Sequence, residues 1–225
     1  MERVLLSNKL LLSFGVITAL SAPVYANDFY NKSINNAPSS KTIITISLEG
    51  SKIADNAKSF VEKLAEDGIG FLENQSLNEE QRKKEFQKVL KNNFDMKTIG
   101  RFALGRYWRT SSKQQQKEYL DLFEKMVVDV YSRRFSDYNG ENFVVVSSRV
   151  QGKSDAIVLS QIVPSSGSKI NVEWRVRKKK NGSLKVVDIM VEGVSMSLTQ
   201  RSDFASVIQR GGGKIDVLLD HLRSN

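Results

Sequence analysis

The stretch Val186–Phe204, VVDIMVEGVSMSLTQRSDF, decides the fold because a strand hands over to a helix within it. Valines and an isoleucine predict a β-strand that runs as far as Val191. The turn at Glu192-Gly193 follows, and a helical pattern opens around Ser197. The upstream chain can pack against this strand-to-helix corner in one of two ways. It either fills a solid core or leaves a cavity for an apolar ligand.

Immediately upstream, the chain predicts a β-hairpin. Lys169–Lys179 and Leu184–Val191 read as strands, and Asn181-Gly182 between them favours a tight two-residue turn. In that register Lys180 opposes Ser183. Three apolar pairs then share one face: Val176 with Val187, Trp174 with Ile189, and Val172 with Val191. On the other face Arg177 opposes Val186, and Arg175 opposes Asp188, where we expect a structural ion pair.

The rest of the chain predicts helices on both sides of the sheet. Phe143–Val150 and Ala156–Val163 complete a four-stranded antiparallel meander. Helical spacing begins at Ser51, and later helices are expected at three caps: the capping boxes Ser76–Glu79 and Ser112–Gln115, and the N-cap Asp95 of a helix over Met96–Gly105. Gly211–Gly213 ends the helix after the corner, and a last short helix follows. The fold class is α+β, with one sheet face covered.

The N-terminal segment has the pattern of a secretory signal peptide. A short charged region precedes the apolar run Leu10–Ala22, and Val24-Tyr25-Ala26 supplies a cleavage site after Ala26. Residues 27–50 then read as a flexible polar leader, and residues 51–225 as one domain. The apolar run is short for a bilayer span, and no Cys follows it as in a lipoprotein. We therefore expect an exported, periplasmic protein.

Composition excludes several kinds of chemistry. The chain has no cysteine and one histidine, His221, which rules out thiol nucleophiles, disulfides and Cys/His zinc sites. No phosphate-binding glycine loop follows a strand, and the carboxylates are scattered. Glu192 and Asp188 are the candidates for a buried acid or base, although such residues are more often turn carboxylates.

The chain is basic, with 34 Lys and Arg against 25 Asp and Glu. Arg175, Arg177 and Lys179 share the solvent face of a predicted strand. The simplest interpretation is a solvated hairpin face. The functional alternative is docking to an anionic lipid surface or to an acidic partner. Nucleic acid is a poor candidate partner for an exported protein.

Three segments together resemble a known family. Phe94-Asp95-Met96 with Gly105–Arg109, the corner Asp188–Ser195, and Arg201-Ser202-x-Phe204 occur in the order typical of the MlaC/Ttg2D (toluene tolerance) family. The helix order, the meander and the final Ile215–Arg223 helix are similar to that family as well. The resemblance covers most of the chain from about Ser51 onward.

The resemblance implies a non-enzymatic phospholipid carrier of the Mla lipid-trafficking ABC system. Such a protein holds phospholipid as cargo, needs no cofactor, and maintains outer-membrane lipid asymmetry. It exchanges lipid with an inner-membrane complex of MCE-domain protein, permease and ATPase, and with an outer-membrane lipoprotein–porin complex, through transient membrane contact. By position, the residues expected to line its apolar lipid cavity are Phe102, Leu104, Trp108, Val172, Trp174, Ile189, Val191, Val194 and Met196.

Two other classes of function stay open at this stage. One is an enzyme on a conical α+β scaffold that acts on a small apolar substrate through Glu192 or Asp188. The other is a periplasmic adaptor with a solid core that binds a partner through its basic hairpin. Large inward aromatic side chains are compatible with a solid core and with a ligand groove.

Overall fold

The computed structural model describes residues 40–224, with side chains from residue 50 onward. The helices are α1 (Ser40–Glu73), α2 (Glu79–Asn93), α3 (Met96–Leu104), α4 (Tyr107–Thr110), α5 (Lys113–Ser132), the 3-10 turn η2 (Phe135–Asp137), α6 (Met196–Arg210) and α7 (Ile215–Ser224). The strands are β1 (Asn142–Gln151), β2 (Asp155–Val163), β3 (Ile170–Lys178), β4 (Leu184–Val191) and β5 (Val194–Ser195). The predicted signal peptide and its cleavage site lie outside the described residues.

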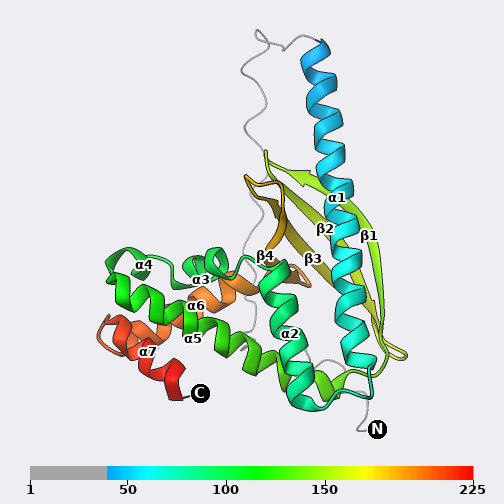
Figure 1. The fold of residues 1–225 in the computed structure, drawn as a ribbon. Coiled ribbons are helices and arrows are strands. Elements are labelled where there is room, and N and C mark those ends of the chain that lie inside the picture. The colour runs from blue at the N-terminus through cyan, green and yellow to red at the C-terminus, as the bar shows by residue number, and fades with distance from the viewer. Residues whose placement is uncertain (1–39, 225) are drawn as a thin grey trace.

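The molecule has two parts that meet along β4. In one part α1 lies along the sheet and packs mainly on β1 and β2 (Figure 1). In the other part α3 to α7 pack on one another beside the β4 end of the sheet. The predicted α+β class is therefore confirmed. No helix within residues 40–224 has an apolar stretch long enough to cross a membrane.

The first helix is longer than predicted. It begins at Ser40 and not near Ser51, so the last part of the segment predicted as a flexible leader is helical. The apolar run Thr42–Leu48 belongs to this helix. Periodicity alone could not decide between strand and helix there, because the run is short.

The sheet is an antiparallel meander of five strands in the order β1 to β5, so the prediction of four strands was wrong by one. The missing strand, Val194–Ser195, has only two residues and pairs with Met190 and Val191 of β4. Glu192 and Gly193 form the turn between them with φ of 49° and 79°. Two consecutive residues at positive φ are the mark of a type I′ hairpin turn, and such a short strand carries no alternating pattern for a sequence to reveal.

The main hairpin contains two offsets that cancel. Its loop has three residues, because Lys179 N–H donates to Ser183 O at 2.8 Å. A β-bulge at Val187 then shifts the register back. Near the loop the predicted pairs are therefore wrong: Val176 opposes Val186 and Arg177 opposes Lys185. Beyond the bulge the predicted pairs are confirmed: Arg175 with Asp188, Trp174 with Ile189, and Val172 with Val191.

Two of the three predicted helix caps are confirmed. Asp95 accepts from the Thr98 N–H at the start of α3, and Ser112 with Gln115 forms a reciprocal capping box at the start of α5. The cap of α2 is Asn78 with Gln81, in place of the predicted Ser76 with Glu79. Asn is as good an N-cap as Ser, and Gln serves as well as Glu three residues later.

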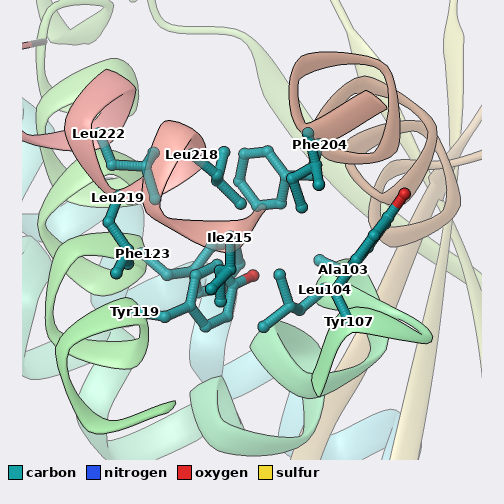
Figure 2. Packing of buried hydrophobic residues seen from close by; sticks show 11 residues of the cluster. Ala103, Leu104, Tyr107, Tyr119, Phe123, Phe204, Ile215, Leu218, Leu219 and Leu222 are labelled. Carbon is teal, nitrogen blue, oxygen red and sulfur yellow. The ribbon is translucent and has the colours of Figure 1, made fainter. Parts of the chain in front are cut away.

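Two hydrophobic clusters stabilise the two parts. Figure 2 shows side chains from α3, α4, α5, α6 and α7 converging in the helical part. Within it Phe204 makes edge-to-face contacts with Tyr119 and Phe123 at centroid distances of 5.9 and 6.2 Å. The second cluster joins α1 to the sheet and consists of Ile53, Ala57, Val61, Ala156, Val158 and Val176.

Candidate functional site

Four of the predicted lining residues form an apolar stripe on the α1 side of the sheet. Residues directly opposite each other on neighbouring strands point to the same face. Trp174 lies opposite Val158, which packs against α1, and Val172 lies two positions before Trp174 on β3. Their partners on β4 complete the stripe of Val172, Trp174, Ile189 and Val191, which we call the apolar stripe.

Trp174 is held in one orientation at the centre of the apolar stripe. Its indole Nε1 donates to Ser160 Oγ at 2.9 Å, and Ser160 Oγ donates to Val172 O at 3.2 Å. The Phe143 ring packs edge-on against the indole with centroids 6.1 Å apart. A buried indole N–H needs a partner, and Ser160 supplies it without bringing a charge to the apolar face.

Burial along the apolar stripe is uneven. Val172 is 3% exposed, whereas Trp174, Ile189 and Val191 are only half-buried. A solid core would bury all four, since apolar side chains at the centre of a domain are normally enclosed. Ile189 and Val191 belong to β4, which lies away from β1 and β2, the strands on which α1 packs most closely. Ile189 and Val191 on that side are partly accessible and can contact another apolar group.

The predicted lining residues of the helical part divide into two groups. Leu104 is fully buried in the helical cluster, and Trp108 packs against the same cluster. Phe102 is 43% exposed on the neighbouring surface of α3. Side chains two residues apart on a helix point in nearly opposite directions, so Phe102 and Leu104 do not line one surface.

At the corner itself, Val194 is 54% exposed and Met196 is half-buried. Val194 belongs to β5 and Met196 opens α6. The structure thus gathers the sheet residues on one face and leaves Phe102, Leu104, Trp108 and Val194 in other surroundings. The complete lining set stays a prediction.

Asp188 organises the start of α6. Its carboxylate accepts from Ser195 Oγ at 2.7 Å and from Ser197 Oγ at 2.7 Å, and also from the Ser197 N–H at 3.2 Å. Ser195 in turn caps α6 by accepting from the Leu198 N–H. The expected Arg175–Asp188 ion pair is therefore wrong, although the two residues are paired in the sheet. The Asp188 carboxylate instead accepts hydrogen bonds from the hydroxyl and amide groups at the start of α6.

Glu192 is also held by hydrogen bonds, in the turn between β4 and β5. Its N–H donates to Asn171 O at 3.0 Å, and its side chain accepts from the Asn171 N–H. These two bonds hold the strained turn residue against the end of β3. The carboxylates of Asp188 and Glu192, the two candidate acids or bases, are therefore both engaged in hydrogen bonds within the corner.

The three cations predicted to dock partners are paired within the protein. Arg175 and Arg177 both bind Asp155, whose side chain is 6% exposed, at 2.8 and 2.7 Å. Lys179 pairs with Asp95. Burial alone would raise the pKa of Asp155, but the hydrogen bonds and charges of Arg177 and Arg175 outweigh burial and lower it. Much of the positive charge of this face is thus neutralised, and its docking role stays a prediction.

Two pockets lie away from the apolar stripe. The larger, of about 510 Å³, lies between α1 and α2 over Phe71, Leu77 and Val89, with a polar rim. The smaller, of about 260 Å³, is polar and lies between α2 and α5. None of the nine predicted lining residues borders either pocket. Among the described residues, no three His, Asp or Glu side chains are grouped to hold a metal ion.

Sequence reasoning missed Asp155 and Ser160. Asp155 follows a turn and reads as a solvated loop carboxylate, and its partners are 20 and 22 residues away. Ser160 did carry a signal. It interrupts a run of inward apolar residues on β2, and a hydroxyl at such a position needs a partner.

Comparisons with known proteins fit this geometry. The family described as MlaC protein matches residues 62–224. The toluene tolerance protein ttg2D of Pseudomonas putida is 22% identical over 115 residues, which cover 51% of this chain and 53% of that protein. The intermembrane phospholipid transport system binding protein MlaC of Haemophilus influenzae is 22% identical over 135 residues, covering 58% of this chain and 62% of that protein. The chain thus spans between one half and two thirds of the length of these relatives.

The fold has a solved counterpart. A phospholipid-binding protein from Ralstonia solanacearum, determined in complex with a phospholipid, superposes with a TM-score of 0.65. The superposition covers 75% of this chain and 95% of that one, at 22% identity. At this identity, the likeness concerns the arrangement of helices and strands.

Proposed function

This chain belongs to the MlaC family, and from that premise we propose that it is a periplasmic phospholipid carrier that moves lipid between the outer and inner membranes. The relatives named for intermembrane phospholipid transport and toluene tolerance support the proposal, as does the phospholipid-bound structure of the same fold. Its partners would be an inner-membrane complex of MCE-domain protein, permease and ATPase, and an outer-membrane lipoprotein–porin complex.

The observation that carries the proposal is the half-buried apolar stripe. Acyl chains need an apolar wall to cross water, because each buried CH₂ contributes about 0.8 kcal/mol. Trp174, Ile189 and Val191 offer such a wall on the α1 side of β3 and β4. We propose that the acyl chains lie against this wall on its β4 side. Trp174, whose orientation is fixed by its hydrogen bond to Ser160, lies at the centre of the contact.

A carrier needs no catalytic group, and the contacts of the corner favour this interpretation over the enzyme. Asp188 and Glu192, the two carboxylates an enzyme would use, are bonded to helix-start and turn groups. The adaptor alternative rested on a free basic hairpin, and its three cations are paired with Asp155 and Asp95.

Native mass spectrometry of the protein purified from a two-membrane host tests the proposal. We expect a mass increase equal to one or more phospholipids, which lipid extraction then identifies. The cargo should exchange into phospholipid vesicles added in excess. Protein that is always lipid-free and takes up nothing from vesicles would contradict the proposal.

A further inference from the structure

Two groups of cations in this protein differ in how they are paired. On the hairpin, Arg175, Arg177 and Lys179 are bound to carboxylates. In the helical part, Arg101, Arg106 and Arg201 are exposed, and within residues 50–224 none of them has a carboxylate partner. The three hairpin cations share two carboxylates, whereas the group without any carboxylate partner lies around α3, α4 and α6.

Each of these three arginines lies over an aromatic ring. The guanidinium carbon is 5.3 Å from the Trp108 ring centroid for Arg101, 5.0 Å from that of Tyr107 for Arg106, and 5.4 Å from that of Phe102 for Arg201. Stacking on a ring limits the rotamers of Arg and leaves N–H groups at the guanidinium edge able to donate. In Arg106 one of these groups, on Nη2, already donates to Tyr107 Oη at 3.0 Å. Such groups are prepared for phosphate oxygens, which Arg binds with two parallel hydrogen bonds.

Contacts of Arg201 bring the three arginines close together, because it lies over Phe102, the residue directly after Arg101, and beside Gly105, the residue directly before Arg106. Arg201 of α6 crosses to α3, where it covers Phe102, and its Nε would lie 2.8 Å from a Cβ on Gly105. Gly105 has φ of 61°, a conformation that glycine adopts readily, and the absence of its side chain leaves room for Arg201. The surface thus joins the Gly105–Arg109 and Arg201–Phe204 segments of the sequence, and we call it the arginine–aromatic surface.

Exposed apolar side chains lie among these charges. Phe102 is 43% and Leu198 is 56% exposed, and Leu198 is one turn before Arg201 on α6. Large apolar side chains beside arginines are typical of surfaces that enter the headgroup layer of a bilayer, where the apolar groups insert and the cations meet lipid phosphates. Neither of the two pockets between α1, α2 and α5 borders this surface.

We propose that the arginine–aromatic surface docks the protein directly on anionic phospholipid bilayers. Arg101, Arg106 and Arg201 contact lipid phosphates, and Phe102 and Leu198 insert between headgroups. The purpose of this contact, to load or unload cargo, rests on the proposed carrier function. The contact itself is a separate property that can be measured without following the cargo.

Vesicle flotation tests the proposal with purified protein and vesicles of phosphatidylethanolamine and phosphatidylglycerol. The double variant Arg101→Gln/Arg201→Gln is compared with Lys153→Gln/Lys169→Gln, which removes the same charge at exposed turns of the sheet. Each arginine near an anionic bilayer contributes about fivefold to binding, so we expect roughly 30-fold weaker binding of the arginine variant. The lysine variant should bind nearly as the wild type does.

The apolar contribution has its own variant and its own prediction. Leu198→Ser removes an exposed side chain, so it should leave the fold intact and still weaken vesicle binding severalfold. Binding should also fall as salt is added and on vesicles of phosphatidylcholine alone. Equal binding of the arginine and lysine variants, or no wild-type binding to vesicles, would overturn the proposal. Capture only by vesicles that carry an acidic protein would overturn it in favour of a protein partner.

Extraction of lipid from the same preparations separates this proposal from the carrier function. If the arginine variant keeps its phospholipid but no longer binds vesicles, both proposals are supported. If the wild type binds vesicles yet never contains phospholipid, the docking surface stands and the carrier function fails.

Discussion

Lys179 of the hairpin forms an ion pair with Asp95, the residue that caps α3. Asp95 also donates its backbone N–H to Val186 O of β4 at 2.9 Å. One residue therefore starts a helix of the helical part and attaches that helix to the sheet. The pKa of Asp95 is lowered, since its bonds to Lys179 and Thr98 outweigh the opposing effect of burial.

We predict that Asp95→Ala destabilises the fold more than Lys179→Met does. Loss of an N-cap costs about 1 kcal/mol and loss of the ion pair adds to it, giving about 2 kcal/mol for Asp95→Ala. Lys179→Met should cost at most about 1 kcal/mol, because Lys179 is 39% exposed and solvent screens the pair. Urea unfolding measures both. Equal losses would show that the cap contributes nothing.

Asp155 leads to a prediction about acid stability. Its folded pKa lies below the ordinary value of 3.8, so the stabilisation is complete above that value and is lost as the pH falls through the lower folded pKa. Asp155→Asn should cost about 2 kcal/mol at neutral pH, since it leaves two part-buried arginines without their carboxylate. It should also flatten the fall of unfolding free energy below about pH 4.

Asp121→Asn is the matched control for Asp155. Asp121 pairs with Lys117 on α5, and its side chain is 67% exposed. The control should change the unfolding free energy little at any pH. An acid limb for Asp155→Asn as steep as in the wild type would contradict the assignment of this carboxylate.

Much of the sheet was predictable because its pattern survives local offsets. The three-residue loop and the bulge at Val187 each shift the register by one residue, and the shifts cancel before Arg175 and Asp188. The alternation that places Trp174 opposite Ile189 therefore looks the same in the sequence with or without them. Neither offset is visible in the sequence, because each adds only one residue and the alternation of apolar side chains continues on both sides of it.

The polar contacts were less predictable than the apolar ones. Arg175 and Asp188 oppose each other in the sheet, yet each binds a different group. The choice depends on three-dimensional competition. Asp155 meets two guanidinium groups at once, and Asp188 meets the free donors of a helix start. Periodicity reports which face a residue occupies and not which of several neighbours it binds.

The apolar stripe gives a direct prediction for lipid binding. Ile189→Glu places a carboxylate on the proposed wall, and burying a charge against acyl chains is strongly unfavourable. We expect severalfold less phospholipid per protein by extraction and native mass spectrometry. Val144→Glu is the control on the same sheet, at a site that is already 47% exposed. Circular dichroism should show both variants folded. An unchanged lipid load in Ile189→Glu would place the acyl chains elsewhere.

Gly105 gives a prediction that links backbone conformation to the arginine–aromatic surface. Its φ and ψ of 61° and −130° are strained for any residue with a side chain, and an added Cβ would also lie 2.8 Å from Arg201 Nε. We expect Gly105→Ala to lower the free energy of unfolding by roughly 2 kcal/mol and to weaken vesicle binding, because Arg201 is displaced from Phe102. Adding Arg201→Ala removes only the collision, so most of the stability loss should persist in urea unfolding. Full recovery of stability in the double variant would assign the cost to the collision and not to the backbone.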